Sequence, residues 1–277
     1  MRKITSSILR VLTYLSIVLT VGMMAVIVVY IFAGGLGHIT PQLLFGDYSS
    51  DNPSMKFAII TTIVLVLVSL IIAVPIGVGC AIYLTEYAKK GSKLVRIIRL
   101  ATETLAGIPS IIYGLFGALF FGTALHLGYS MLTGIFTISI MVLPTIIRTS
   151  EEAIQGVPDL YREGSFGLGA GKLRTIMRIV LPSAANGIFS AIMLSVGRMV
   201  GETAALIFTL GSVAQMPKSL LDSSRTLAVH MYISTRDGGM AGRNVAFATG
   251  AVLIIIVVAI NIFTLYLSRK AGKMNEV

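Results

Sequence analysis

The sequence predicts an all-α membrane protein with six transmembrane helices and both termini in the cytoplasm. Three observations lead to this prediction. First, 55% of the 277 residues are hydrophobic and only 12% are charged, against about 25% charged residues in a soluble domain. Second, no charged residue occurs at positions 57–85 or 104–147, whereas a spanning helix needs only ~20 apolar residues. Third, lysine and arginine collect in alternate connecting segments, as they do in cytoplasmic loops.

The predicted spans, in chain order, are residues 11–33, 57–85, 104–124, 129–147, 184–210 and 245–268. The first is longer than the ~7–15-residue hydrophobic region of a signal peptide, so we expect it to remain uncleaved. The third and fourth are separated by a short stretch around His126 and are expected to form a tight hairpin. Pro75 and Pro109 predict bends in their helices, because proline lacks a backbone N–H. No linker or repeat divides residues 1–277, which predicts one membrane domain.

The charge distribution fixes the expected orientation. If the N-terminus is cytoplasmic, sixteen lysines and arginines lie in inner segments and five in outer ones, with Arg198 inside a span. The five outer residues are Lys56, Lys218, Arg225, Arg236 and Arg243. The net charge of +10 then follows from topology and contact with anionic lipid, and predicts no nucleic-acid partner. Cys80 is the single cysteine and the three histidines lack metal-ligand spacing, so we expect no disulfide and no metal site.

The inner segment 148–183 is far longer than a turn requires. Thr149 and Glu152 have the form of a capping box, which predicts that a short helix begins there. A second helix is predicted over residues 159–168, and Gly169 is expected to end it in a left-handed conformation.

The rest of this segment, residues 172–179, predicts a basic amphipathic stretch on the membrane surface, with a corner into the fifth span at Leu181-Pro182. The whole loop resembles the cytoplasmic EAA loop of importer-type ABC permeases, whose pattern is Glu-Ala-Ala-x3-Gly-x9-Ile-x-Leu-Pro. The matching residues are Glu163, Gly164, Ser165, Gly169, Ile179, Leu181 and Pro182. Glycine and serine replace the two alanines. The resemblance implies a coupling helix that docks into a groove on an ATP-hydrolysing subunit.

ATP hydrolysis by this chain itself is not expected. A phosphate-binding loop needs Gly-x4-Gly-Lys followed by serine or threonine. Here Lys172 is followed by Leu173, and Phe166 stands where the first glycine is required. We therefore predict no catalytic residue and no cofactor in this chain. The resemblance implies that ATP and Mg are bound by partner ATPase subunits.

Two charged residues, Arg198 and Glu202, lie deep in the fifth predicted span. Ionisable groups at that depth are costly unless they are paired or face water, so they are candidates for function. At i and i+4 on a continuous helix they would share a face and could neutralise each other. Arg148 and Glu151 offer a second pair at the inner end of the fourth span. A guanidinium binds oxyanions well, so these residues favour an anion path; a salt bridge with a purely structural role is the alternative.

Three further segments resemble phosphate-importer permeases, and their order fits the PstA-type subunit better than its PstC-type partner. They are Leu105-Ala-Gly-Ile-Pro-Ser-Ile-Ile-Tyr-Gly114, Arg198-Met-Val-Gly-Glu-Thr-Ala-Ala205 and Thr226-Leu-Ala-Val-His-Met-Tyr232. The resemblance implies a type I ABC importer permease fold in a prokaryotic cell membrane. It also implies that Arg148, Glu151, Arg198 and Glu202 lie on or near a phosphate path.

The partners that this resemblance implies are a second, PstC-type permease, two PstB-type ATPase subunits and an extracytoplasmic PstS-type phosphate-binding protein. Two alternatives stay open at the level of the sequence. The cargo could be another oxyanion, sulfate or molybdate, or the chain could be an ion-coupled secondary transporter working alone. The missing inverted repeat and the loop pattern stand against the second alternative.

Overall fold

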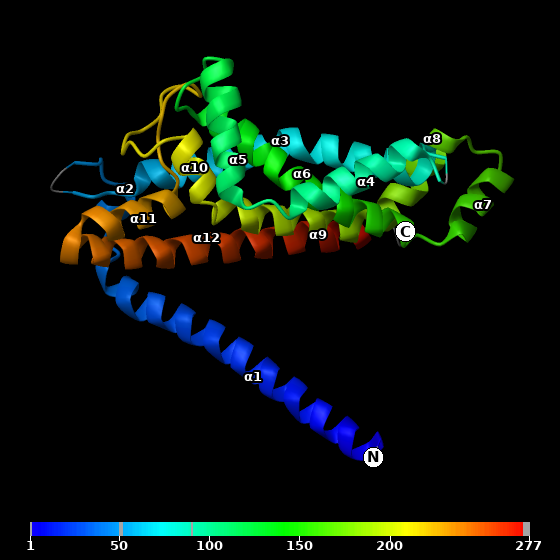
Figure 1. Ribbon diagram of the computed structural model, residues 1–277, viewed down its shortest axis with the longest axis horizontal. Helices are drawn as coiled ribbons and strands as arrows, with labels where there is room; N and C mark the ends of the chain where they lie inside the picture. Colours follow the sequence, from blue (N-terminus) through cyan, green and yellow to red (C-terminus); the bar gives the residue numbers. More distant parts are fainter. Residues whose placement is uncertain (1, 50–51, 90, 274–277) are drawn as a thin grey trace.

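The computed structural model describes residues 2–49, 52–89 and 91–273, and all regular structure within these ranges is helical (Figure 1). The long helices are α1 (Arg2–Gly35), α3 (Lys56–Ile82), α6 (Met131–Gln155), α9 (Leu181–Val200) and α12 (Gly239–Lys273). The shorter ones are α2 (Pro41–Phe45), α4 (Lys93–Ala106), α5 (Ser110–Gly117), α7 (Asp159–Gly167), α8 (Lys172–Thr175), α10 (Ala204–Thr209) and α11 (Leu227–Asp237). A 3-10 turn, η1 (Leu36–His38), and three π-helical segments, η2 (Tyr83–Tyr87), η3 (Ala118–Ala124) and η4 (Ile176–Val180), complete the set.

Among the described residues, five helical stretches are long and apolar enough to cross a membrane: Leu9–His38, Lys56–Tyr87, Met131–Gln155, Lys172–Val200 and Gly239–Tyr266. The third predicted span, residues 104–124, corresponds to a bent pair of helices, because the chain bends by 103° between α4 and the helix formed by α5 and η3. The bend expected at Pro109 is therefore confirmed, although it separates two helices instead of kinking one. α3, in contrast, continues through Pro75. The all-helical fold predicted from the sequence is confirmed.

The fifth predicted span differs from the structure at both ends. Helix begins at Lys172 and runs through α8, η4 and α9 to Val200. The expected corner at Leu181-Pro182 is therefore wrong, because the π-helical segment η4 leads directly into α9 and the helix runs on through Pro182. The expected continuation of this helix to residue 210 is also wrong, since α9 ends before Gly201 and α10 starts afresh.

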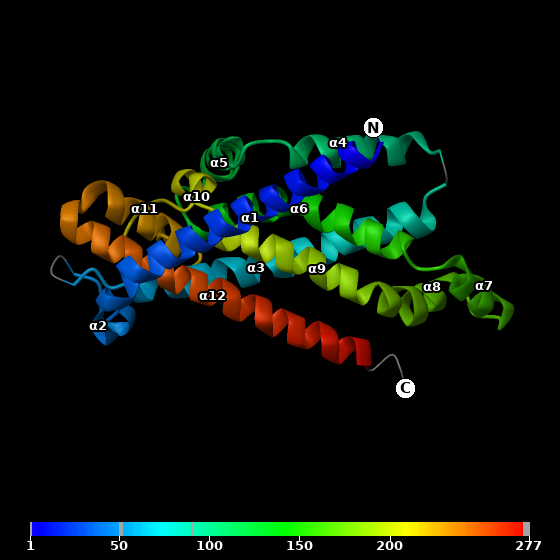
Figure 2. The same cartoon turned by 90° about the horizontal axis from the view of Figure 1, so that it is seen from below.

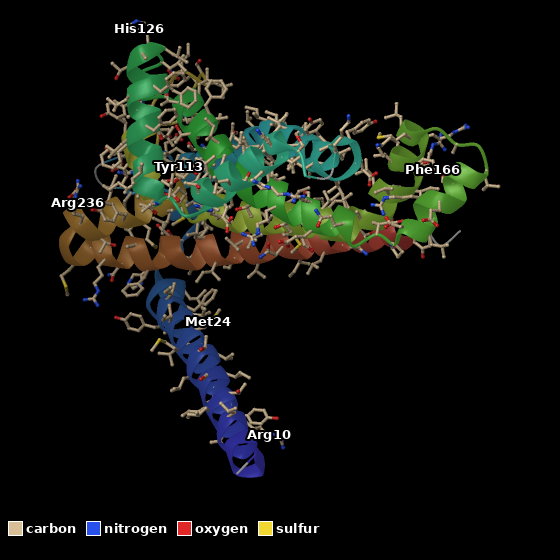
Figure 3. The ribbon with its side chains drawn as sticks, turned by 45° about the vertical axis from the view of Figure 1, so that its right-hand side comes forward. Arg10, Met24, Tyr113, His126, Phe166 and Arg236 are labelled. Atoms are coloured by element: carbon tan, nitrogen blue, oxygen red, sulfur yellow. The ribbon has the colours of Figure 1, made fainter. Side chains whose placement is uncertain are left out.

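α6 is the central helix and packs against α3, α4, α5 and α9. Close packing replaces the hydrophobic effect as the force between helices in lipid, and small residues allow it. Gly77 of α3 illustrates this, because a Cβ atom there would lie 2.6 Å from Cγ2 of Ile146 in α6. The hairpin expected between η3 and α6 is confirmed; His126 lies at its tip with a φ of 57° (Figure 3).

α1 extends away from the rest of the molecule and touches it through its C-terminal end (Figures 1 and 2). Its apolar segment is unburied within the chain. The contact is with α12, where Tyr30 packs edge-on against Phe247 and Gly35 lies so close to the Phe247 carbonyl that no side chain would fit. α1 begins, and α12 ends, toward the end of the molecule that carries α7 and α8 (Figure 1).

At the opposite end, an aromatic cluster encloses a buried histidine. The Phe57 ring lies edge-on to His230, with 5.5 Å between ring centroids, and the Arg225 guanidinium lies 5.5 Å from the Phe57 ring. Within the described residues neither ring nitrogen of His230 has a hydrogen-bond partner. Burial, and then the charge of Arg225, lower the pKa of His230 to about 3.

This pKa predicts a loss of stability in mild acid. Unfolded His230 titrates near 6.5, whereas the folded side chain stays neutral down to about 3. The unfolded state therefore binds more protons below pH 6.5, so stability is complete above that pH and falls as the pH drops, by at most ~1.4 kcal/mol per unit. Thermal unfolding of the purified chain between pH 7 and 5 measures this slope. We expect His230→Leu to flatten it and the exposed control His126→Asn to leave it unchanged; an equal slope in His230→Leu would contradict the assignment.

Candidate functional site

The first part of the candidate site is the break between α9 and α10, at residues 201–203. Glu202 is buried here, and its Oε1 accepts a hydrogen bond from the backbone N–H of Ala205 at 3.0 Å. The carboxylate thus satisfies a free N–H at the start of α10, as capping side chains do. The expectation that Arg198 and Glu202 form a pair along one helix is wrong, because the helix stops between them.

Arg198 lies in the last turn of α9 and is half-buried. Within the described part of the chain it makes no ion pair. Its charge acts on the nearby hydroxyl of Tyr113 in α5. Tyr113 is itself buried and donates a 2.8 Å hydrogen bond to the Leu105 carbonyl, which bridges the bend between α4 and α5 (Figure 3). A guanidinium without a carboxylate partner therefore lies beside this bend.

The two helix breaks lie next to each other because α5 packs directly on α10. A Cβ atom at Gly114 would lie 2.7 Å from the Ala205 Cα, so only glycine permits this approach. Broken helices at membrane depth expose backbone polar groups, and they are tolerated where protein or a water-filled cavity satisfies those groups. Paired breaks of this kind are typical of substrate sites in transporters.

A cavity of about 680 Å³ opens beside the second break, between α5, α10 and α11. Its lining residues are Ile111, Thr203, Ala204, Ile207, Phe208, Ala228, Met231, Tyr232, Thr235 and Arg236. Thr203 belongs to the break, and Arg236 lies near the end of α11 (Figure 3). The cavity therefore extends from the break to the end of α11.

The second part of the candidate site lies at the C-terminal end of α6. Arg148 pairs with Glu152, Nε to Oε1 at 3.3 Å, and the expected pair with Glu151 is not formed. Glu151 instead pairs with Arg99 of α4, with 2.6 Å between Nη2 of Arg99 and Oε1 of Glu151. The same oxygen accepts a hydrogen bond from the side-chain amide of Gln155. The reason is geometric: Glu152 is four residues from Arg148 and lies on the same exposed face, whereas Glu151 faces α4.

These charges surround a polar cavity of about 340 Å³ between α4 and α6. It is lined by Arg99, Thr102, Glu103, Arg148, Glu151, Glu152 and Gln155. The cavity does not include Arg198 or Glu202, so the four predicted path residues form two separate groups. No local signal identified Arg99, because its partner lies 52 positions along the chain.

The observed pairing is testable by double-mutant cycles. We expect Arg99→Gln and Glu151→Gln each to cost about 1 kcal/mol, because the pair is partly exposed. The double mutant should unfold no earlier than either single mutant, since both remove the same interaction. Arg148→Gln and Glu151→Gln should instead be additive. Thermal unfolding of the five variants measures these effects; strong coupling between Arg148 and Glu151 would contradict the observed geometry.

The third part of the candidate site is the loop after α6. Thr149 and Glu152 lie inside α6, so the predicted helix start there is wrong: their i, i+3 spacing also suits the middle of a longer helix. The predicted second helix is present as α7, and Gly169 follows it with a φ of 81°, as expected. α7 and α8 then lie together at one end of the molecule (Figure 1).

The surface of this loop is unusually apolar. A groove of about 520 Å³ lies between α7 and η4, lined by Leu160, Tyr161, Gly164, Ser165, Leu168, Ala170, Arg174, Arg178 and Ile179. Leu168 is 92% exposed, and Phe166, two positions before it, is exposed as well (Figure 3). Exposed apolar patches of this kind mark sites of contact with other proteins or with membranes.

The residues that carry the loop pattern take different positions. Glu163 is exposed, and a Cβ atom at Gly164 would meet no atom within 4 Å. Ser165 is buried and shares a 2.8 Å hydrogen bond with Thr175, which joins α7 to α8. Leu181 packs beneath the loop at the start of α9. The residues of the pattern therefore have two roles: Glu163 and Gly164 lie on an open surface, and Ser165 holds α7 against α8.

Comparisons with known proteins agree with this architecture. The chain is 29% identical over 261 residues to the probable ABC transporter permease protein YqgI of Bacillus subtilis, covering 88% of each chain. It is 33% identical over 207 residues to the phosphate transport system permease protein PstA of Mycobacterium leprae, covering 74% of this chain and 67% of the relative. The phosphate transport system permease protein PstC of Haemophilus influenzae also matches, at 31% identity over 224 residues, covering 72% of this chain and 70% of the relative.

The fold is also found among solved structures. A chain of the bacterial alginate ABC transporter, in complex with an alginate pentasaccharide-bound periplasmic protein, superposes with a TM-score of 0.65 over 98% of this chain and 95% of its own length, at 16% identity. The family model for the binding-protein-dependent transport system inner membrane component matches residues 73–273. The chain therefore belongs to this family of ABC importer permeases, as a multi-pass membrane protein.

Proposed function

We propose that this chain is the PstA-type permease subunit of an ATP-driven importer of inorganic phosphate. The observation that carries the proposal is the Arg198 guanidinium, which lacks an ion-pair partner in the described residues and lies beside two adjacent helix breaks. A delocalised, permanently charged fork of donors suits a tetrahedral oxyanion. The 33% identity to a PstA subunit supports phosphate as the cargo.

The end of the molecule that carries α7 and α8 is proposed to face the cytoplasm, in keeping with the excess of lysine and arginine in those segments. The groove beside Gly164 and Leu168 would then dock on an ATPase subunit. ATP and Mg would be bound by these partner ATPase subunits.

The complete importer would contain a second, PstC-type permease, two PstB-type ATPases and a PstS-type phosphate-binding protein. In this arrangement Arg198 and Glu202 lie on the phosphate path, and Arg148 and Glu151 lie near its cytoplasmic end. Membership of the family favours this ATP-driven importer over a secondary transporter working alone.

Transport by the reconstituted complex tests the proposal. We expect proteoliposomes containing the permeases and ATPases, supplied with ATP inside and phosphate-loaded binding protein outside, to accumulate radiolabelled phosphate. A hundredfold excess of sulfate or molybdate should not reduce uptake. Uptake of labelled sulfate or molybdate in place of phosphate would assign another oxyanion, and uptake independent of ATP would overturn the mechanism.

A further inference from the structure

Arg162 of α7 makes more hydrogen bonds than is usual for a side chain in a connecting loop. Its side chain is 14% exposed and forms an ion pair with Glu86, whose side chain is 9% exposed. Both Nε and Nη2 of Arg162 donate hydrogen bonds to Oε1 of Glu86, at 3.0 and 2.8 Å. Glu86 belongs to η2, the π-helical end of the membrane-spanning helix α3, so the pair links two segments that are 76 positions apart.

The other donors of Arg162 reach two further segments. NH2 also donates to the carbonyl of Ile154 in the last turn of α6, at 3.0 Å. NH1 donates to the Val157 carbonyl at 2.7 Å and to the exposed carboxylate of Asp159 at 3.1 Å. A guanidinium has five N–H donors, and these five hydrogen bonds use all of them. Arg162 therefore joins α7, α3 and α6 at one point.

A second contact joins η2 to α8, the helix that follows α7 in this loop. The Lys172 ammonium, at the start of α8, lies 4.8 Å from the centre of the Tyr87 ring. Glu86 and Tyr87 are adjacent, so α7 contacts one residue of η2 and α8 contacts the next. π-helical turns are rare and frequently mark functional positions, and here the π-helical turn carries both contact residues.

Beneath these contacts lies a small apolar cluster that makes the junction stiff. Its buried members are Ala81, Ile154, Val157, Val180 and Ala184. They come from α3, α6, the loop, η4 and α9. Close-packed contacts of this kind transmit displacement because they resist compression. The outer face of α7 meanwhile carries no such packing, since positions 164 and 167 have open space around them.

We propose that the Arg162–Glu86 ion pair is the positioning link that transmits movements of α7 to the membrane-spanning helices α3 and α6. The inference rests on the proposed function, in which α7 docks on an ATPase subunit. When that subunit moves α7, the two hydrogen bonds from Arg162 to Glu86 and the one to Ile154 carry the displacement into η2 and the end of α6. Neither residue touches the cargo; both act on the conformation of the path.

The test is the number of phosphate ions transported per ATP hydrolysed by the reconstituted complex. Glu86→Ala removes the acceptor of two Arg162 hydrogen bonds, and Glu86→Gln keeps a neutral acceptor. Asp159→Ala is the matched control, because it removes the exposed partner of the same arginine. We expect ATP hydrolysis and complex yield to persist in all three variants. The transport ratio should fall at least about tenfold in Glu86→Ala, the equivalent of ~1.4 kcal/mol, less in Glu86→Gln, and stay at the wild-type value in Asp159→Ala.

A purely structural pair gives a different pattern. Yield and melting temperature would then fall together in Glu86→Ala, with a wild-type ratio in the complex that remains, and that result would overturn the link. Should Glu86→Ala fail to assemble, Arg162→Lys replaces it, because lysine keeps the charge but cannot make five hydrogen bonds. A wild-type ratio in Arg162→Lys, or its failure to assemble, also overturns the link. A wild-type complex that moves no phosphate would instead refute the proposed function.

Discussion

Replacing Arg198 with glutamine is expected to slow phosphate uptake about thirtyfold in a complex that still assembles. The residue supplies a positive charge that the described residues leave without an ion-pair partner, next to the breaks before α5 and α10. One unit charge at ~7 Å is worth roughly 2 kcal/mol at an effective dielectric constant near 20, which is about thirtyfold in rate. Uptake at fixed binding-protein concentration measures the effect. The control is Arg96→Gln, which removes a guanidinium from the exposed surface of α4.

Two substitutions of Glu202 distinguish the effect of its charge from the effect of its hydrogen bond to α10. Glu202→Gln keeps an oxygen that can accept the Ala205 N–H, so α10 should remain capped while the negative charge disappears. We expect this variant to retain phosphate longer and release it more slowly. Glu202→Ala also loses the cap, at a cost of about 1 kcal/mol, and should melt earlier. Normal transport by well-folded Arg198→Gln would rule out the path assignment, whatever the Glu202 variants do.

The second large effect is expected at Gly164, where tryptophan should weaken docking of the ATPase subunit. The position is open within this chain, so the added ring obstructs only a docked partner. Overpacking of an interface costs ~1–3 kcal/mol, which weakens the association about 5- to 150-fold. Co-purification of the ATPase subunit and phosphate uptake should both fall, while the melting temperature of the isolated chain stays unchanged.

Gly164→Ala is the matched control for this experiment. Alanine is the residue of the EAA pattern at this position, and it favours the helix by ~0.5–1 kcal/mol over glycine. The variant should therefore bind the ATPase normally and be slightly more stable. Wild-type co-purification and uptake in Gly164→Trp would show that this face of α7 is not the docking surface.

The sequence by itself determined the membrane character, the all-helical fold and the loop pattern, because these depend on local composition. An uncharged run such as residues 57–85 has to span the membrane as a helix, where every backbone polar group finds a partner within the segment. The glycine at position 169 ends α7 for an equally local reason, since its positive φ is disfavoured for other residues. The sharp bend at Pro109 also followed from the residue alone.

Only the tertiary structure decided which charges meet. Spacing along a helix paired Arg198 with Glu202, but α9 ends between them and the carboxylate caps α10. Spacing also paired Arg148 with Glu151, whereas Glu151 turns inward to Arg99 and Arg162 reaches Glu86 across 76 positions. An ion pair depends on distance and direction in space. The sequence around a charged residue does not show which residue of another helix will be its partner. The packing of α4, α6 and α7 supplies that information, and with it the residues proposed here to control transport.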